Sequence, residues 1–404
     1  MQGSRQLVIR PVLACGGCGA GYAIATDETL MFVCGLVSVW ASPARHGPER
    51  QLAGAVWPLY FARVFTQPAD LPEALLSDAL TDGWGFRPAL LSYQAVGFGS
   101  HHWLAVDPGG RKLFVTVDDL SDKLRGGADT TSAVFGRLEQ AFESALSLRR
   151  DAGLGFVVAP LPATGGRVLR RLTGRYSLVV HPYLAGCQAG PDGEFVSSAD
   201  RHAVLALLVR LHSAKAARPP ADTFEIPGRT GLLAAMHSTG QRWQAGPYGT
   251  RSRDLLARHA ADLGALLAAF DELAGRVRTR GDRMVITHGG PDAANVLKTP
   301  AGLVLVDWES ALLAPPERDL WALAESEPGL LDAYTAATGA AIDTDALAVH
   351  RMWYDLAEIS LYIRWFRSSH DDTADAAEGW QNLQCFLRPA QRWPDVLARP
   401  AGGT

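Results

Sequence analysis

Three polar residues in the last third of the sequence have the types and spacing of a phosphate-transfer site. His288 and Asn295 lie seven positions apart in a polar segment that follows a short apolar run, and Asp307 ends the next apolar run. Phosphate-transfer sites hold Mg²⁺ with an amide and a carboxylate from two loops that face each other, and the phosphates supply further ligands. We therefore expect Asn295 and Asp307 to bind a divalent metal ion.

The elements around these residues must bring them together. The run 284–287 is expected to form a strand, residues 288–295 a polar loop, and the run 303–306 a strand of a hairpin. Because Asn295 and Asp307 emerge from short strands of one hairpin, we expect their side chains to lie within a few ångströms of each other.

The wider pattern predicts two lobes. Strand-like runs separated by glycine-rich turns, with one amphipathic helix at 132–150, indicate a small β-rich lobe over residues 67–180. Residues 181–404 are expected to form a larger, mostly helical lobe that carries the loops described above. The predicted fold class is α+β with two lobes, and small ligands usually bind between lobes.

The segment 286–320 resembles the aminoglycoside phosphotransferase and choline kinase family, small-molecule relatives of the protein kinase fold. It begins ITHGGPDAANVL and continues, from Leu303, as LVLVDWESALLAPPERDL. The second part is similar to the spectinomycin phosphotransferase branch in particular. The resemblance covers about residues 68–387 and is specific in 286–320. It implies a protein-kinase-like fold and transfer of phosphate from ATP, with Mg²⁺, to a hydroxyl of a small molecule such as an aminoglycoside or aminocyclitol antibiotic.

The resemblance also implies roles for individual positions. Asn295 and Asp307 match the family's metal ligands, and His288 matches the histidine that holds the catalytic loop. Asp319 matches a buried aspartate that supports this loop, and Glu139 or Glu143 would be the helix glutamate that pairs with a strand lysine. The nucleotide would be bound by the glycine loop, with Gly97, Gly99 and Ser100, and by the hinge, with His181, Tyr183 and Leu184.

Two positions depart from the family pattern. The family's catalytic aspartate falls two residues after the histidine, where this chain has Gly290, and the family's strand lysine matches Thr116. The chain has only four lysines. Lys112 lies four residues from Thr116, which is roughly 13 Å along a strand, and no other lysine is close to Thr116 in the sequence.

Asp292 lies two residues beyond Gly290, and we hypothesise that it is a relocated catalytic base. A general base contributes about 10²–10⁴ to the rate, so an enzyme can lose part of this and still turn over. The alternative is a catalytically impaired pseudokinase that binds nucleotide or ligand without transfer. A third hypothesis is an inert structural relic without activity, which would be favoured if residues 1–66 block the cleft between the lobes.

Composition excludes several other kinds of protein. The net charge of −4, from 38 basic and 42 acidic residues, gives no field that would attract nucleic acid. Walker-A, GxSxG, HExxH and complete GxGxxG motifs are absent. The uncharged stretches near the start are shorter than the about 20 residues of a membrane helix. We expect a cytoplasmic protein with a small-molecule partner and no nucleic-acid or membrane partner; the sequence does not indicate its oligomeric state.

Residues 1–66 differ from the rest of the chain because they carry no sustained hydrophobic period. We expect an atypical, poorly ordered extension, which an upstream start assigned too early would also produce. Residues 12–15 resemble a lipoprotein cleavage box, although Arg10 lies where the apolar region should be. Cys15 and Cys18 could form half a zinc site, but no second pair completes it.

Two features of the helical lobe have competing interpretations. The carboxylates that include Asp355, Glu358, Asp371 and Asp372 could line a substrate pocket, but such charges are more often a solvated helix face. His212, in the helix expected at 200–214, is interpreted as a packing residue.

Overall fold

The computed structural model describes residues 66–97, 99–190, 193–243, 245–281 and 283–398. Before residue 66 it gives only the backbone of three short strands: β1 (Arg10–Pro11), β2 (Tyr22–Thr26) and β3 (Thr29–Met31). The expectations for the extension over residues 1–66, including those for Cys15 and Cys18, therefore lie outside the described residues.

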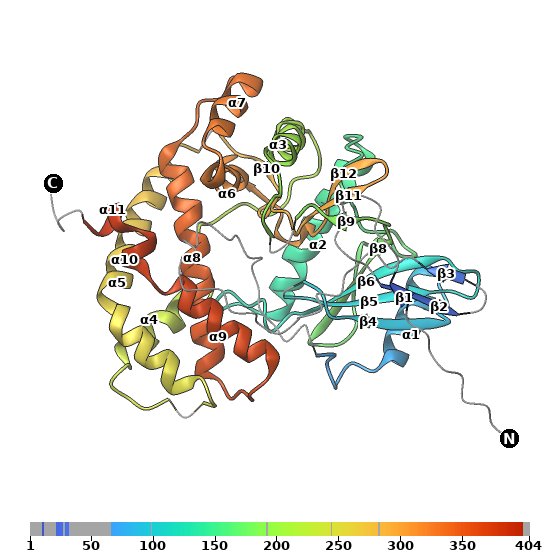
Figure 1. Ribbon diagram of the computed structural model, residues 1–404, viewed down its shortest axis with the longest axis horizontal. Helices are drawn as coiled ribbons and strands as arrows, with labels where there is room; N and C mark the ends of the chain where they lie inside the picture. The colour runs from blue at the N-terminus through green and yellow to red at the C-terminus, as the bar shows by residue number, and fades with distance from the viewer. Residues whose placement is uncertain are drawn as a thin grey trace.

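The N-lobe is built on a five-stranded antiparallel sheet in the order β4-β5-β6-β8-β7 (Figure 1). The sequence predicts strands in this lobe at 90–96, 103–106, 113–117, 157–160, 168–172 and 176–180, and the sheet strands fall on all of these runs but 157–160. The run 157–160 forms only an isolated bridge between Val157 and Leu305. The strands are β4 (Leu90–Gln94), β5 (His101–Val106), β6 (Lys112–Asp119), β7 (Leu169–Arg171) and β8 (Tyr176–Pro182).

Each face of this sheet is covered by one helix. Because side chains alternate along a strand, Val115 and Val117 of β6 lie on one face with the apolar side chains of α1 (Glu73–Trp84). Helix α2 (Thr131–Arg150) packs on the other face against Val179 of β8. The face covered by α2 also carries the even-numbered residues of β6. One of them is Thr116, the position at which the family pattern has a lysine.

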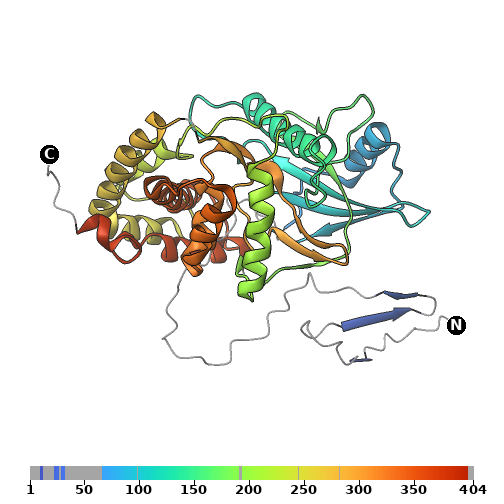
Figure 2. The ribbon, with the colours of Figure 1, turned by 90° about the horizontal axis from the view of Figure 1, so that it is seen from above.

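The C-lobe is mostly helical, and Figure 2 shows its helices on the opposite side of the molecule from the sheet. Its core is formed largely where α5 and α8 pack together. None of the helices in the described ranges is both long enough and apolar enough to cross a membrane. The helices are α3 (Ser198–His212), α4 (Arg229–His237), α5 (Gly249–Thr279), α6 (Glu317–Ser326), α7 (Gly329–Thr338), α8 (Thr344–Arg367), α9 (Ala374–Phe386), α10 (Pro389–Arg392) and α11 (Pro394–Leu397).

Short strands at the boundary between the lobes carry the loops of interest. The predicted hairpin is formed by β11 and β12, and β9, which follows β8 in the chain, pairs with β11. Strand β10 pairs instead with β13. The elements are β9 (Cys187–Gln188), β10 (Val285–Thr287), β11 (Val296–Thr299), β12 (Gly302–Leu305), the 3-10 helix η2 (Trp308–Ser310) and β13 (Leu312–Ala314).

The two lobes are joined through backbone and side-chain contacts. Val158 donates an N–H to the carbonyl of Leu305, and Leu305 donates to the carbonyl of Phe156. The Arg364 side chain of α8 donates to the carbonyls of Asp122 and Leu124 in the loop after β6. The α+β class and the two-lobed layout predicted from the sequence are confirmed.

Candidate active site

A buried carboxylate holds the loop that follows β10. Asp319, in the first turn of α6, accepts N–H hydrogen bonds from His288 at 2.8 Å and from Gly289 at 2.6 Å. The side chain is fully buried. Burial alone would raise the pKa of Asp319, but the hydrogen bond from His212 and the positive charge of Arg318 hold it below its usual range. Asp319 therefore fixes the loop as an anion.

His212 is the partner that the sequence interpretation missed. Its Nε2 lies 3.1 Å from Oδ2 of Asp319, and its Nδ1 lies 2.9 Å from the hydroxyl of Tyr334. The packing interpretation is therefore incomplete, because the ring of His212 also positions the carboxylate. Its partners are 107 and 122 residues away along the chain, so no local pattern indicates this contact.

His288 links the loop to the hairpin. Its Nε2 lies 2.7 Å from the carbonyl of Val306, which can only accept, so Nε2 carries the proton and Nδ1 accepts the N–H of Gly290 at 3.3 Å. The ring packs edge-on against Trp308, with 4.7 Å between centroids. Burial lowers the pKa of His288, so the neutral ring acts as a positioning group.

The two expected metal ligands leave the same end of the β11–β12 hairpin. The carbonyl of Asn295 accepts the N–H of Val306 at 3.0 Å, which places Asp307 one residue beyond this bond. The Asn295 Nδ2 donates to the carbonyl of Gly290 at 2.9 Å, so Oδ1 is the atom that can bind a metal. Asp307 has a left-handed backbone with φ of 64°, a conformation that is concentrated at functional sites in residues other than glycine.

The electrostatic environment of Asp307 favours a cation. Its side chain reaches solvent, yet the protein around it removes part of its hydration and raises its pKa to about 6. The ammonium of Lys123 opposes this rise, and the charge of Asp118 adds to it. A bound cation would relieve the repulsion between these carboxylates.

Asp292 lies in the same loop, and only one of its two carboxylate oxygens has a hydrogen-bond partner among the described residues. Its Oδ1 accepts the N–H groups of Ala294 at 2.9 Å and Asn295 at 3.2 Å. Its Oδ2 is buried without a hydrogen-bond partner in the described part of the chain. Burial raises the pKa of Asp292 to about 8, and the charges of Asp307 and Glu194 contribute to the rise.

A buried lysine, Lys123, joins the end of β6 to this site. Its Nζ lies 2.6 Å from Oε1 of Glu309, 3.2 Å from Oδ1 of Asp118 and 3.2 Å from Oγ of Ser100. Burial opposes the charge on Lys123, but Glu309 and Asp118 outweigh this effect and raise its pKa. The loop after β6 therefore brings Lys123, seven residues after Thr116 in the sequence, to Asp118, which is two residues from Thr116 on β6.

The glycine loop connects β4 to β5. Gly97 and Gly99 have φ angles of 74° and 84°, which side chains disfavour, so glycine is required for this turn. Ser100 is buried, and its hydroxyl donates to Oδ1 of Asp118 at 2.7 Å. The structure therefore brings Ser100 to the carboxylate and lysine cluster.

Of the predicted hinge residues, His181 lies in β8, and Tyr183 and Leu184 follow this strand. His181 lies edge-on to Phe142 of α2 at 6.0 Å, and burial lowers its pKa to about 4, so the ring is neutral. Tyr183 is exposed, with the ammonium of Lys112 5.3 Å from its ring centre, and Leu184 is half-buried. Strand β8 extends to Pro182, so the boundary expected at 180/181 falls inside a strand.

Neither glutamate predicted on α2 pairs with a lysine within the described ranges. Glu139 forms an ion pair with Arg167 at 2.5 Å, and Glu143 is exposed. Thr116, at the expected lysine position, lies 3.1 Å from Nδ1 of His102 through its hydroxyl. The carboxylate that contacts Lys123 most closely belongs to Glu309, two residues after Asp307, and not to a glutamate of α2.

The carboxylates of α8 do not form a solvated face. Asp355 and Glu358 are buried, and Asp355 forms a bidentate ion pair with Arg392 of α10 and accepts a hydrogen bond from Trp393. The solvated-face interpretation is therefore wrong for these two residues. Burial raises the pKa of Glu358 well above its usual range.

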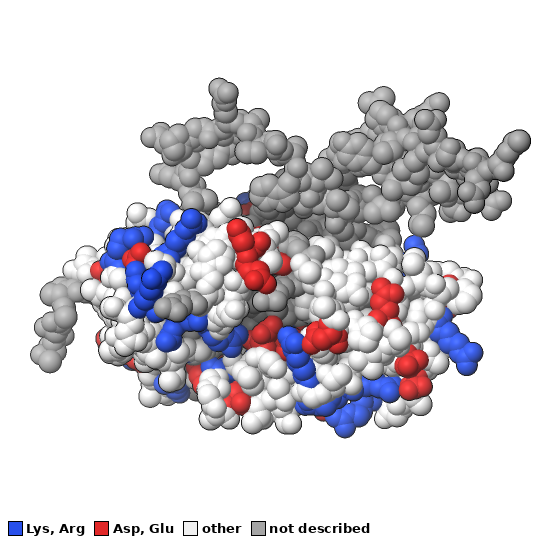
Figure 3. All heavy atoms as spheres, turned by 90° about the horizontal axis from the view of Figure 1, so that it is seen from below, with Lys and Arg blue, Asp and Glu red and all other residues white. Residues whose placement is uncertain are grey.

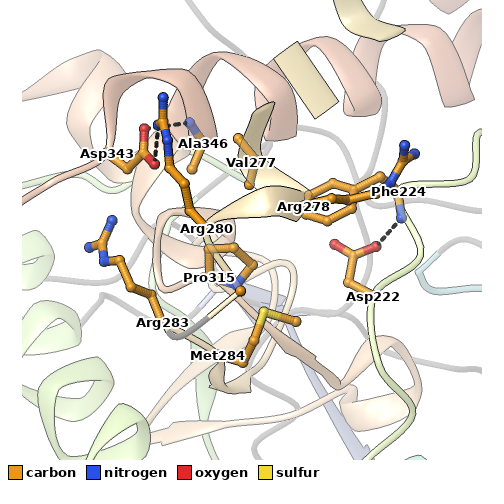
Figure 4. A pocket seen from close by; sticks show the side chains of 11 residues that line it. Asp222, Phe224, Val277, Arg278, Arg280, Arg283, Met284, Pro315, Asp343 and Ala346 are labelled. Atoms are coloured by element: carbon orange, nitrogen blue, oxygen red, sulfur yellow. Dashed lines mark hydrogen bonds and ion pairs between the residues drawn. The ribbon is translucent and has the colours of Figure 1, made fainter. Parts of the chain in front are cut away.

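A separate cavity of about 170 Å³ lies where the end of α5 meets β10 and the start of α8 (Figure 4). None of the site residues predicted from the sequence lines it. Its arginines have partners, such as Asp343 for Arg280 and Glu317 for Arg283. On the face shown in Figure 3, basic and acidic side chains occur in small neighbouring groups.

Replacement of Gly289 by Ala is expected to lower the free energy of unfolding by about 2 kcal/mol. Gly289 has a φ of 99°, and an added Cβ would collide with the guanidinium of Arg318. This guanidinium donates to Oγ1 of Thr287 and to the carbonyl of Ser310, so it cannot move without breaking buried hydrogen bonds. Urea denaturation measures the effect.

The neighbouring glycine provides a matched control. Gly290 has no left-handed φ, and an added Cβ would meet Nδ2 of Asn295 at 3.5 Å, an ordinary contact. Gly290→Ala should therefore change the unfolding free energy by less than about 1 kcal/mol. Equal losses in the two variants would contradict the steric argument.

Comparisons with known proteins show which family this chain is similar to in sequence and in fold. A family model described as "Phosphotransferase enzyme family" matches residues 110–353. Protein StrN of Streptomyces griseus is 32% identical over 265 residues, which are 62% of this chain and 77% of StrN.

Solved structures share the fold. Spectinomycin phosphotransferase APH(9)-Ia, in complex with ADP and spectinomycin, is similar with a TM-score of 0.59 at 14% identity, over 79% of this chain and 97% of that chain. Amicoumacin kinase hAmiN, in complex with AMP-PNP and Ca²⁺, has a TM-score of 0.51 at 12% identity, over 80% and 94%. The family match spans more than half of the chain and includes the segment 286–320. The chain therefore belongs to the phosphotransferase enzyme family and has its two-lobed, kinase-like fold.

Proposed function

We propose that this protein transfers the terminal phosphate of ATP to a hydroxyl group of a small molecule, with Mg²⁺ bound by Asn295 and Asp307. The observation that supports this most directly is the end of the β11–β12 hairpin, from which both residues emerge. Relatives of the same fold were solved with ADP and with AMP-PNP, which supports a nucleotide as the phosphate donor.

The donor set fits a magnesium ion. Asn295 and Asp307 supply neutral and anionic oxygen, the hard ligands that Mg²⁺ prefers. Within the described ranges, no group of three or more His, Cys, Asp or Glu side chains is placed to hold a metal alone. Phosphate oxygens and water must therefore complete the shell, as is usual for Mg²⁺ in phosphotransferases. When bound, the ion would neutralise phosphate charge.

Asp292 is the residue proposed to accept the proton. The acceptor's hydroxyl oxygen forms a bond to the γ-phosphorus while the bond from phosphorus to the ADP oxygen breaks, and the hydroxyl proton passes to Oδ2 of Asp292. This oxygen has no hydrogen-bond partner in the described residues, so it has a free lone pair for the task. Asp319 and His288 hold the loop in which Asp292 lies.

The pH dependence of the reaction tests this assignment. Since only the ionised carboxylate can accept a proton, and burial raises the pKa of Asp292 to about 8, kcat/KM should rise up to about pH 8. Asp292→Asn should lower kcat by about 10²–10⁴ and remove this acidic limb. An unchanged rate in Asp292→Asn would exclude Asp292 as the base.

The acceptor is proposed to be a hydroxylated aminocyclitol, an aminoglycoside-like antibiotic or a related metabolite, acted on in the cytoplasm, where ATP is available. The fold shared with spectinomycin phosphotransferase supports this class. Transfer of labelled phosphate from ATP to a panel of such compounds tests it. An increase in the minimum inhibitory concentration on expression would indicate a role in antibiotic resistance.

A nucleotide-binding pseudokinase is the second candidate function. It is favoured by Gly290, which lacks a side chain at the position of the family's catalytic aspartate, and by Thr116, whose hydroxyl contacts His102. Binding of MgATP without transfer to any acceptor in the panel would support this function over the first.

A further inference from the structure

Lys123 differs from the other three lysines, all of which lie in the described ranges, because it alone is buried. We propose that Lys123 binds a phosphate group of the nucleoside triphosphate, in the role that a strand lysine would have at position 116. This inference rests on the proposed function, since it assumes that a nucleotide occupies the site. Lys123 would then be the residue of this chain that supplies a positive charge to the phosphates.

The ammonium of Lys123 lies on the face of the sheet that carries Thr116. Thr116 and Asp118 are two residues apart on β6, so their side chains share the face that α2 covers. Lys123 lies in the loop beyond the strand, and its Nζ reaches Oδ1 of Asp118 at 3.2 Å. The charge that is missing at Thr116 is therefore supplied near the next residue on the same face.

The glycine loop meets the same ammonium. Ser100, directly after Gly99, has its Oγ 3.2 Å from Nζ of Lys123. Backbone N–H groups of such a loop approach phosphate oxygens. A phosphate covered by the loop would therefore come within reach of Lys123.

One of the contacts of Lys123 is with a neutral group that a phosphate oxygen can replace. The contacts with Glu309 are 2.6 and 2.7 Å long, whereas the contact with the Ser100 hydroxyl is 3.2 Å. A phosphate oxygen can replace this neutral hydroxyl while the ion pair with Glu309 remains. Ser100 would keep its own bond to Asp118, at 2.7 Å.

The charges around Lys123 are consistent with a ligand-binding role. Asp118 and Glu309 are in ion-pair contact with its ammonium, and Asp307 interacts with it electrostatically. Three carboxylates against one ammonium leave an excess of negative charge, which a divalent cation that arrives with the triphosphate would offset. A buried ion pair contributes little net stability relative to apolar side chains, so stability alone does not account for this cluster.

The test compares the binding of MgATP and of adenosine to the full chain by isothermal titration calorimetry. Lys123→Met should weaken MgATP binding by about tenfold to a hundredfold and leave adenosine binding unchanged, because only the phosphates contact Lys123. Lys298→Met, which removes an ion pair with Asp200 on the surface, is the matched control and should change neither affinity. In a Lys123→Met background, Thr116→Lys should recover MgATP affinity.

The outcomes separate this inference from the proposed function. Equal MgATP affinity in wild type and Lys123→Met would overturn the inference, even where the wild type transfers phosphate. A loss of adenosine and MgATP binding together would also overturn it, because it would indicate a structural role. A Lys123-dependent affinity for MgATP without transfer to any acceptor would uphold the inference and reject the proposed function. A wild type that binds neither compound would overturn both.

Discussion

Asp307→Asn is expected to lower the rate of phosphate transfer about 10³-fold while the protein remains folded. The substitution keeps the size of the side chain but removes the proposed anionic metal ligand at the end of the β11–β12 hairpin. Asn295 alone would then have to hold the ion, with a neutral oxygen. The rate of transfer from labelled ATP at saturating MgCl₂ measures the loss, and partial recovery with Mn²⁺ would support a role in metal binding.

Thermal unfolding across the pH range provides the control for Asp307→Asn. The protein around Asp307 raises its pKa to about 6, so its ionised form is less favourable in the folded chain than in the unfolded chain. The contribution of Asp307 to the stability of the wild type therefore falls as pH rises from the unfolded pKa, near 3.8, through about 6, and this fall is absent from the variant. Asp307→Asn should melt at the same or a higher temperature at pH 7. A lower melting temperature would mean that lost activity reflects misfolding.

Asp319→Ala is expected to lower the free energy of unfolding by about 3–5 kcal/mol. The substitution removes the acceptor of the His288 and Gly289 N–H groups and the partner of Nε2 of His212, all in a buried region. Urea denaturation measures the loss. Asp343→Ala, which removes a partly exposed cap of α8, should cost only about 1 kcal/mol and is the matched control.

Acid titration gives a second measure of the role of Asp319. Its pKa is held below the usual value in the folded chain, so its contribution is complete above the unfolded pKa of about 3.8. The contribution is lost as pH falls through the lower, folded pKa. The stability difference between wild type and Asp319→Ala should therefore shrink on acidification. A difference that stays constant from pH 6 to pH 2 would contradict the assignment.

Local patterns were sufficient to predict most of the fold. Strand-like runs in the sequence predicted the five strands of the N-lobe sheet, and apolar side chains of these strands pack with α1 or α2. The hairpin that relates Asn295 to Asp307 was also local, since its two strands are close in sequence. The loop support by Asp319 followed from a motif, and the structure adds its hydrogen bonds.

Long-range contacts could not be predicted in this way. Lys123 is separated from Glu309 by 186 residues, and a lysine after a strand is ordinarily solvated, so its burial had no local signal. The sequence also did not indicate that Asp355 is buried, because its partner Arg392 belongs to a different helix. In both cases a charged side chain is buried because the tertiary fold brings it an opposite charge.

The pairing of β9 with β11 limits how far the two lobes can move against each other. The chain leaves the N-lobe sheet at Pro182 and enters the strand pairing of the C-lobe at Cys187, which pairs opposite Lys298. A second backbone connection, from Leu305 to Phe156 and Val158, ties the same hairpin to the segment before β7. A rotation of one lobe against the other would therefore have to leave both connections intact or break the hydrogen bonds of Leu305.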